Sequence, residues 1–311
     1  MAYILLAVTV LLGTAKSIVT KGVHTDKGGF SRTMLVNVVS FLVAFVTVFL
    51  IGIPELKTPF SVPWGMAVAN AVCVLFSQVA YMKAIEYGPI ALSSLFYSCG
   101  FVVSTTWGCI YYHENINALH IVGFLLVIVS FVLVTLPKRN GNTPFNVRWL
   151  ICAIVAMILS GGIGITQKLF TSNYAEYSLN YFLYTVFLCI VAMSGVLYVI
   201  LTLIRHCKSK RFASSTQQSG QEQKAVKSRD VKAIVCTLVL GVILGVYNKV
   251  NTYLAGVLPS VVVFPVINGG VIVITTLASA LVYKEKLTVL QILGVCVCVI
   301  SIVLIALGQN I

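Results

Sequence analysis

Three lysines interrupt apolar stretches of the sequence, at positions where a charged side chain is costly. Lys16 and Lys168 lie about four and two residues from the end of their stretch, and Lys249 lies inside a third. A lysine at the centre of a bilayer costs roughly 2.5 to 3.5 kcal/mol, so each one needs water, a partner or a route to the interface. Two interpretations stay open for each lysine. Its ammonium reaches the headgroups along the alkyl chain, or it faces a cavity and attracts an anionic or carboxylate-bearing substrate.

Long polar side chains recur on single faces of four apolar stretches, 64–84, 89–111, 232–254 and 259–283. Because polar groups in hydrocarbon are costly, we expect these faces to turn away from lipid. Small polar residues can simply join helices, whereas long ones favour a cavity, since helix packing needs short side chains. In the last stretch, Pro265 precedes Asn268-Gly269-Gly270, a place where a helix can kink and expose its backbone. The residues predicted to line a substrate cavity are Lys16, Gln78, Tyr81, Tyr97, Lys168, Asn248, Lys249 and Asn268.

The sequence carries no signature of an enzyme or of a metal site. His113-Glu114-Asn115-Ile116-Asn117 begins like the zinc-protease helix but has Asn where that helix needs its second His. There is no nucleophile elbow and no phosphate-binding loop, and the nine cysteines lie mostly in apolar stretches, as small hydrophobic residues do. No acidic residue lies deep in an apolar stretch, so a carboxylate that exchanges a proton for a cationic drug is missing. We therefore expect no enzyme activity, no catalytic residue, no metal and no cofactor.

The elements that must position these residues are membrane-spanning helices. Of the 311 residues, 59% are hydrophobic and 9% are charged, and the mean hydropathy is +1.00. Soluble domains have roughly 25% charged residues. Apolar stretches of about 20 residues, the length that crosses a bilayer, recur along the whole chain. The predicted fold is an all-α polytopic membrane protein with ten transmembrane helices, at 2–20, 31–52, 64–84, 89–111, 118–137, 149–170, 178–204, 232–254, 259–283 and 288–308.

The net charge of +13 lies mostly in the connections between the spans, where it orients a membrane protein and does not imply nucleic acid. Lys and Arg gather in the odd-numbered connections, so the positive-inside rule places these in the cytoplasm and both termini outside. The first span begins at Ala2 with no cleavage site after it, so we expect no removed signal peptide. Residues 205–231, rich in Ser, Gln and Lys, are predicted to form a flexible loop. The basic start of this loop either anchors the topology or binds anionic headgroups.

The two halves of the sequence repeat one pattern. Each half has an apolar helix opened by a proline, followed by a glutamate that precedes a glycine by nine residues: Pro89, Glu114 and Gly123 in the first half, and Pro259, Glu285 and Gly294 in the second. Five spans per repeat is an odd number, so the second copy enters the membrane from the opposite side. The predicted domains are a five-helix repeat at 1–137, an inter-repeat loop at 138–148 and a second five-helix repeat at 149–311.

This pattern resembles the drug/metabolite transporter superfamily, in its EamA-type branch. The resemblance implies a central cavity between the repeats and alternating access, commonly for the export of amino acids, metabolites or toxic compounds. Related nucleotide-sugar and sugar-phosphate carriers handle anions and use cavity lysines. Two features depart from the family pattern. Leu11-Leu12-Gly13 stands where the first helix often has a tryptophan, and the family is usually drawn with both termini in the cytoplasm, against the charges here.

We expect a secondary active transporter of small metabolites or drugs, working as an exporter in the plasma membrane. The expected substrate is an amino acid or an anionic metabolite, and the expected partners are this small molecule, the lipid bilayer and a coupling proton or counter-solute. No nucleic acid is expected, and a homodimer stays open. The alternatives are an uptake carrier or exchanger for sugar or nucleotide-sugar solutes, a non-transporting scaffold or lipid-interacting protein, and an intramembrane enzyme. Polar helix faces argue against a scaffold, which needs no wet interior, and missing acid–base pairs argue against an enzyme.

Overall fold

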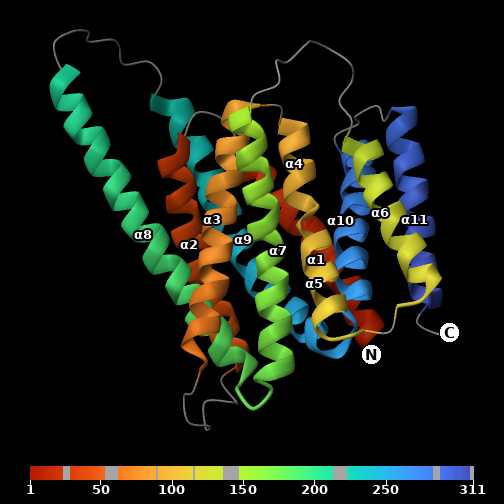
Figure 1. Ribbon diagram of the computed structural model, residues 1–311. Coiled ribbons are helices and arrows are strands. Elements are labelled where there is room, and N and C mark those ends of the chain that lie inside the picture. Colours follow the sequence, from red (N-terminus) through yellow and green to blue (C-terminus); the bar gives the residue numbers. More distant parts are fainter. Residues whose placement is uncertain are drawn as a thin grey trace.

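The computed structural model describes residues 1–23, 29–52, 62–88, 90–114, 116–135, 147–212, 223–282 and 288–308. All regular structure in these ranges is helical (Figure 1). Eight helices among the described residues are long and apolar enough to cross a bilayer. An all-α polytopic membrane protein is therefore confirmed at that level.

The helices follow the predicted spans closely. The first half forms α1 (Ala2–Val23), α2 (Gly29–Gly52), α3 (Trp64–Tyr87), α4 (Ile90–Ser98), α5 (Gly100–Tyr111) and α6 (Ala118–Thr135). The second half forms α7 (Val147–Asn173), α8 (Leu179–Phe212), α9 (Gln223–Val257), α10 (Ser260–Val282) and α11 (Val289–Gly308).

One predicted span, 89–111, is divided into α4 and α5 at Cys99, which forms a turn. The next residue, Gly100, packs closely on α7. A Cβ on Gly100 would lie 2.7 Å from the Ser160 Cβ and 2.8 Å from the backbone nitrogen of Gly161. The backbone of the span therefore approaches α7 where only glycine fits.

The kink expected in α10 does not interrupt that helix, which runs from Ser260 to Val282 with Pro265 inside it. The segment 205–231 also contains more helix than predicted, because α8 continues to Phe212 and α9 begins at Gln223. Lys, Arg and Gln are good helix formers, so they can prolong a helix beyond its apolar part. Nearly all of the predicted inter-repeat loop, and Pro89 and Glu285 of the repeated pattern, lie outside the described residues.

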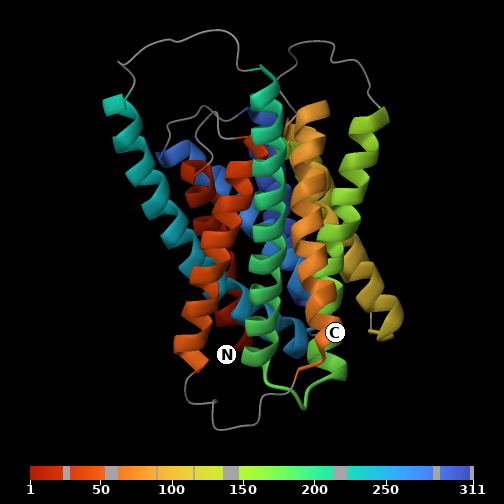
Figure 2. The same ribbon diagram turned by 90° about the vertical axis from the view of Figure 1, so that its left-hand side faces the viewer.

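The contacts between the two halves are reciprocal, and Figures 1 and 2 show the helices of the bundle from two directions. By order within each half, α1 corresponds to α7, α2 to α8, α3 to α9, the α4–α5 unit to α10 and α6 to α11. Helix α3 packs on α7 as α1 packs on α9, and α5 packs on α7 as α1 packs on α10. Likewise α3 packs on α8 as α2 packs on α9, while α2 contacts α8 and α6 contacts α11. Helices α6 and α11 form one edge of the bundle, and α8 leans outward at the other (Figure 1).

The two larger of three apolar cores among the described residues flank the polar interior. One includes Phe101 of α5 and Phe264 of α10, and the other includes Phe41 of α2 and Phe187 of α8. These four rings also line a common cavity. The polar residues of the helices therefore meet between the two cores.

Candidate functional site

The cavity between the cores has a volume of about 180 Å³ and is lined by residues of both halves. This is smaller than the roughly 300 to 1,000 Å³ of sites for drug-sized ligands, so it suits a small metabolite. No acidic residue that the structure describes lines it, and Lys16 of α1 supplies its charge. Its polar lining residues are Lys16, Asn70, Gln78, Tyr97, Ser104, Ser160, Gln167, Tyr247, Asn248, Asn251 and Asn268.

The Lys16 ammonium has neither a carboxylate nor a hydrogen-bond acceptor among the described residues. Its Nζ lies 4.8 Å from the centroid of the Tyr247 ring, a cation–π contact worth about 0.5 to 2 kcal/mol. Gly13, about one turn earlier on α1, packs on Val271 and on the same tyrosine ring. This close packing holds Lys16 at the cavity while its three N–H donors stay unused.

Two asparagine side chains of the cavity are oriented by their own helices. The Nδ2 of Asn248 donates to the carbonyl oxygen of Leu244 at 2.9 Å, and the Nδ2 of Asn268 donates to that of Phe264 at 2.8 Å. A carbonyl oxygen only accepts, so these bonds fix which end of each amide is the nitrogen. Both Oδ1 atoms are left as acceptors.

Two glutamines of the cavity are held by their side-chain oxygen instead of their nitrogen. Asn37 donates its Nδ2 to the Oε1 of Gln78, and Asn251 donates its Nδ2 to the Oε1 of Gln167 at 2.8 Å. The Nε2 groups of both glutamines remain as donors. The cavity therefore combines donors, led by the Lys16 ammonium, with asparagine oxygens that accept.

Five of the eight residues predicted for the cavity line it: Lys16, Gln78, Tyr97, Asn248 and Asn268. Tyr81 lies behind Tyr97, because its hydroxyl is 2.7 Å from the Oγ of Ser94 and the two tyrosine ring centroids are 4.9 Å apart. Lys168 and Lys249 do not line the cavity. Substrate binding by the five lining residues stays a prediction.

Three further carboxamides of the lining, Asn70, Gln167 and Asn251, were not among the predicted site residues. Asn70 precedes Gln78 by eight residues on α3, so the helical period places both on one face. The signal for Gln167 is its spacing from a glycine. It follows Gly164 by three residues, as Lys16 follows Gly13.

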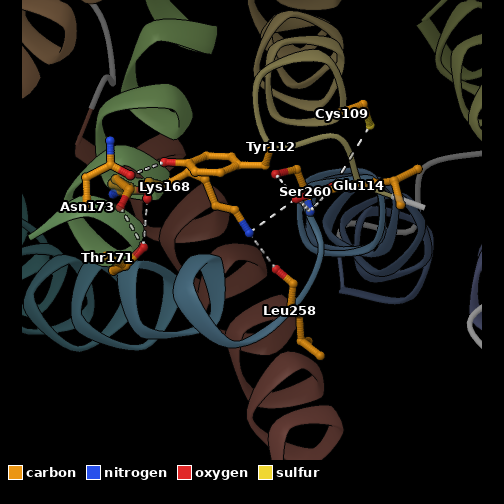
Figure 3. A network of polar contacts seen from close by, with 10 residues as sticks. Cys109, Tyr112, Glu114, Lys168, Thr171, Asn173, Leu258 and Ser260 are labelled. Atoms are coloured by element: carbon orange, nitrogen blue, oxygen red, sulfur yellow. Dashed lines mark hydrogen bonds and ion pairs between the residues drawn. The ribbon is translucent and has the colours of Figure 1, made fainter. Parts of the chain in front are cut away.

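Lys168 belongs to a second polar cluster, beside the cavity (Figure 3). Its Nζ lies 3.3 Å from the Oε1 of Glu114, with the two side chains 9% and 10% exposed, and it donates to the Leu258 carbonyl oxygen at 3.1 Å. Of the two interpretations of Lys168, neither describes this arrangement, because a partner holds the ammonium. Removing one partner of a pair this buried costs about 3 to 5 kcal/mol.

Glu114 is the N-terminal cap of α10. The backbone nitrogen of Ser260 donates to both carboxylate oxygens, at 2.9 and 2.8 Å, and the Ser260 hydroxyl donates to Oε1 at 2.9 Å. Leu258 and Pro259 before the helix carry no side-chain oxygen that could do this locally. The unpaired N–H groups and the dipole of a helix N-terminus favour an anion there. Because Glu114 belongs to the first half and α10 to the second, this cap ties the halves together.

Two local features bring Glu114 to α10. His113 has a φ of 49°, the left-handed conformation that commonly ends a helix, and it turns the chain after α5. Gly108 of α5 faces α10, and a Cβ on it would overlap the Ser260 side chain. Glu114 lies at the end of a span, as expected. Its side chain is nevertheless only 10% exposed, whereas Glu86 and Glu176 are exposed.

Tyr112 covers the ion pair from one side. The Lys168 Nζ lies 5.6 Å from the centroid of its ring. Burial raises the pKa of the Tyr112 phenol, so the hydroxyl stays protonated and donates to the Oδ1 of Asn173 at 3.0 Å (Figure 3). Aromatic cover of this kind keeps water from the charges and strengthens their attraction.

The relationship of the chain to known proteins is distant. No family model matches it. It is 27% identical over 109 residues to the pseudopaline exporter CntI of Pseudomonas aeruginosa (strain UCBPP-PA14), a match that covers 33% of this chain and 38% of that protein. A solved structure described as "Crystal structure of protein" is similar with a TM-score of 0.72 and 12% identity, over 99% of this chain and 98% of the other. At such low identity the second similarity shows the fold alone. The apolar helices and the partial similarity to an exporter together support a membrane-embedded transporter in general.

Proposed function

We propose that the protein is a secondary active transporter that exports a small solute by alternating access to the cavity. The observation that carries this proposal is a polar, singly charged cavity enclosed jointly by the two halves. A site held between two bodies that can rock against each other is how such transporters expose a substrate to each side in turn. A scaffold or lipid-interacting protein gains nothing from a cavity of six carboxamides and a lysine, because these groups cost free energy in a bilayer.

The two halves are proposed to be inverted five-helix repeats, as in the EamA-type transporters that the sequence resembles. The reciprocal packing supports this, because a pseudo-two-fold axis would relate each contact of one half to its counterpart. Matched residues support it too. Gln78 and Asn248, 170 positions apart, both line the cavity. Gly100 and Gly270, also 170 positions apart, pack closely on α7 and α1, the first helices of the opposite halves.

The proposed substrate is an amino acid or an anionic metabolite, and the proposed location is the plasma membrane. Lys16 supports an anionic group, and the cavity volume supports a solute smaller than a nucleotide sugar. A proton gradient or a counter-solute is the proposed source of energy. No catalytic residue, metal or cofactor is part of the proposal.

Alternating access is tested without knowing the substrate. A single cysteine is placed at Asn268 in a variant without other cysteines, and its reaction with a membrane-impermeant thiol reagent is followed in vesicles of both orientations. An N-terminal tag identifies the side. We expect labelling from both sides, because the cavity opens to each in turn, and none for a control cysteine at Val303, which lies on an exposed apolar face. Labelling of Asn268→Cys from neither side would overturn the proposal.

A further inference from the structure

A ligand in the cavity has to neutralise a charge that has no counter-charge in the part of the chain that the structure describes. The Lys16 ammonium faces the cavity without an acceptor or a carboxylate among the described residues. A charge out of bulk water is costly unless it is paired and hydrogen-bonded. A carboxylate in the cavity would supply the missing charge and accept the unused N–H groups, and the Nε2 groups of Gln78 and Gln167 are further donors in the same lining.

The rest of the occupant has to donate hydrogen bonds. The Oδ1 atoms of Asn248 and Asn268 are available as acceptors, because both amide nitrogens are held by backbone carbonyls. An ammonium group satisfies such oxygens, whereas a second carboxylate would repel them. Taking this with the volume of about 180 Å³, we infer that the cavity binds a small zwitterion, with its carboxylate at Lys16 and its ammonium at the asparagine oxygens. The inference rests on the proposed transport function and names its substrate class.

The test is binding to the purified full-length protein, measured by titration calorimetry with the twenty proteinogenic L-amino acids as probes. Each acid that binds is compared with its amide, which lacks the carboxylate, and with its amine-free acid. We expect at least one amino acid to bind, and both analogues to bind at least tenfold more weakly. The inference fails if no amino acid binds, or if an amide binds as tightly as its acid.

Two variants separate the two ends of the ligand. Lys16→Met should weaken the amino acid at least tenfold and leave the amide unchanged, because only the carboxylate meets Lys16. Asn268→Leu should weaken the amino acid and leave the amine-free acid unchanged. Lys249→Met, which removes a lysine outside the lining, is the matched control and should bind as the natural chain does. Equal losses for acid and amide in Lys16→Met would contradict the assignment. Two-sided labelling of Asn268→Cys together with failed amino acid binding would spare the transport proposal and reject only the zwitterion.

A second inference comes from the Glu114–Lys168 cluster, whose residues lie about one helical turn from the lining of the cavity. Ser104, Gly164 and Phe264 line the cavity on α5, α7 and α10. One turn away on the same helices lie Gly108, Lys168 and Ser260, respectively, which form or border the cluster. On each of these three helices, the turn lies toward the end of the bundle where α1 begins and α11 ends (Figure 1).

Glu114 belongs to the first half. At this end of the bundle its carboxylate is bound by Ser260 and Lys168 of the second half. Rocking of the halves that opens this end has to separate Glu114 from the start of α10. The geometry points to a latch: the Glu114 cap holds this end shut and is released when the cavity opens there.

The latch is tested on the Asn268→Cys background by the ratio of labelling rates from the two sides. Glu114→Gln should raise the rate from the side of the chain termini at least threefold and lower the rate from the other side. Glu86→Gln breaks an exposed pair with Lys83 and should leave the ratio unchanged. Ser260→Ala, which removes only one donor to Glu114, should shift the ratio less but in the same direction, and it serves if Glu114→Gln does not reach the membrane. A loss of thermal stability without a change in this ratio would show that the cap is structural only, and would overturn the latch.

Discussion

The three intramembrane lysines differ in what lies within reach of their ammonium groups. The Lys16 ammonium lies over a tyrosine ring and lines the cavity. The Lys168 ammonium forms an ion pair with a carboxylate and donates to a carbonyl oxygen. Lys249 lies outside the cavity lining and makes no ion pair with any residue that the structure describes. Because the side chain is the same, the surroundings alone decide the cost of losing the charge. The same substitution therefore separates three situations.

Lys168→Met should lower the free energy of unfolding by about 3 to 5 kcal/mol, because it leaves the buried Glu114 carboxylate without its counter-charge. Lys249→Met should change it by less than about 0.5 kcal/mol, since no ion pair among the described residues is lost. Unfolding by SDS in mixed micelles measures both. Equal stabilities of the two variants would contradict the buried pair.

His113 offers a test of backbone geometry beside the same pair. Its φ of 49° suits glycine and excludes β-branched residues. His113→Gly should keep the stability of the natural chain, whereas His113→Val should lose about 1 to 3 kcal/mol and misplace Glu114. Thermal unfolding in detergent compares the two. If valine is tolerated as well as glycine, the turn after α5 does not require this conformation.

At this scale the sequence predicts which residues are polar in apolar surroundings, but not their partners. Gln78, Tyr97, Asn248 and Asn268 follow from helical phase alone. The partner of Lys168 does not, because Glu114 is 54 positions away and looks like the end of a span. Burial of its carboxylate depends on how α5, α7 and α10 meet, which no local pattern encodes.

At the scale of elements, glycines set how closely helices of opposite halves approach. Gly100 faces Ser160 and Gly161 of α7, and the break between α4 and α5 occurs beside it. Gly195 of α8 differs, because a Cβ added to it would meet no atom of another described element within 4 Å. The same change at these two glycines therefore has opposite consequences.

Gly100→Ala should destabilise the protein by about 1 to 3 kcal/mol, because the added methyl meets backbone that cannot move aside. Gly195→Ala should be neutral or stabilising by up to about 1 kcal/mol, since alanine favours a helix and its methyl has open space here. Thermal unfolding midpoints of the two purified variants decide this. A neutral Gly100→Ala would mean that α5 and α7 can separate without cost.

The spans themselves are readable from apolar run length, and most helix ends fall within a few residues of the prediction. Where they differ, the physical reason is not hydropathy. Basic residues have a high helix propensity, so they prolong α8 and α9 beyond the apolar parts of these helices. The break at Cys99 lies beside the close contact of Gly100 with α7, whereas Pro265 leaves α10 continuous. Pro265 is thus no guide to where α10 ends.

For the whole molecule, the repeated pattern in the sequence predicts which helices correspond, and the packing of α1, α3, α7 and α9 is reciprocal in that way. The repeat does not predict how the halves differ. Lys16 and Gln167 hold matching places after their glycines, so the cavity carries one charge and not two. On the proposed function, this asymmetry is the feature that transport should depend on.

Counterflow into liposomes that contain the purified protein tests transport through the Lys16 cavity most directly. The liposomes are loaded with a mixture of unlabelled L-amino acids, and uptake of the same amino acids carrying tritium is followed. We predict saturable uptake well above that of protein-free liposomes. Lys16→Met should reduce it at least tenfold, about 1.4 kcal/mol, while Lys249→Met should not change it. Uptake no faster than in protein-free liposomes, or equal uptake by Lys16→Met and the natural chain, would contradict the transport of amino acids through this cavity.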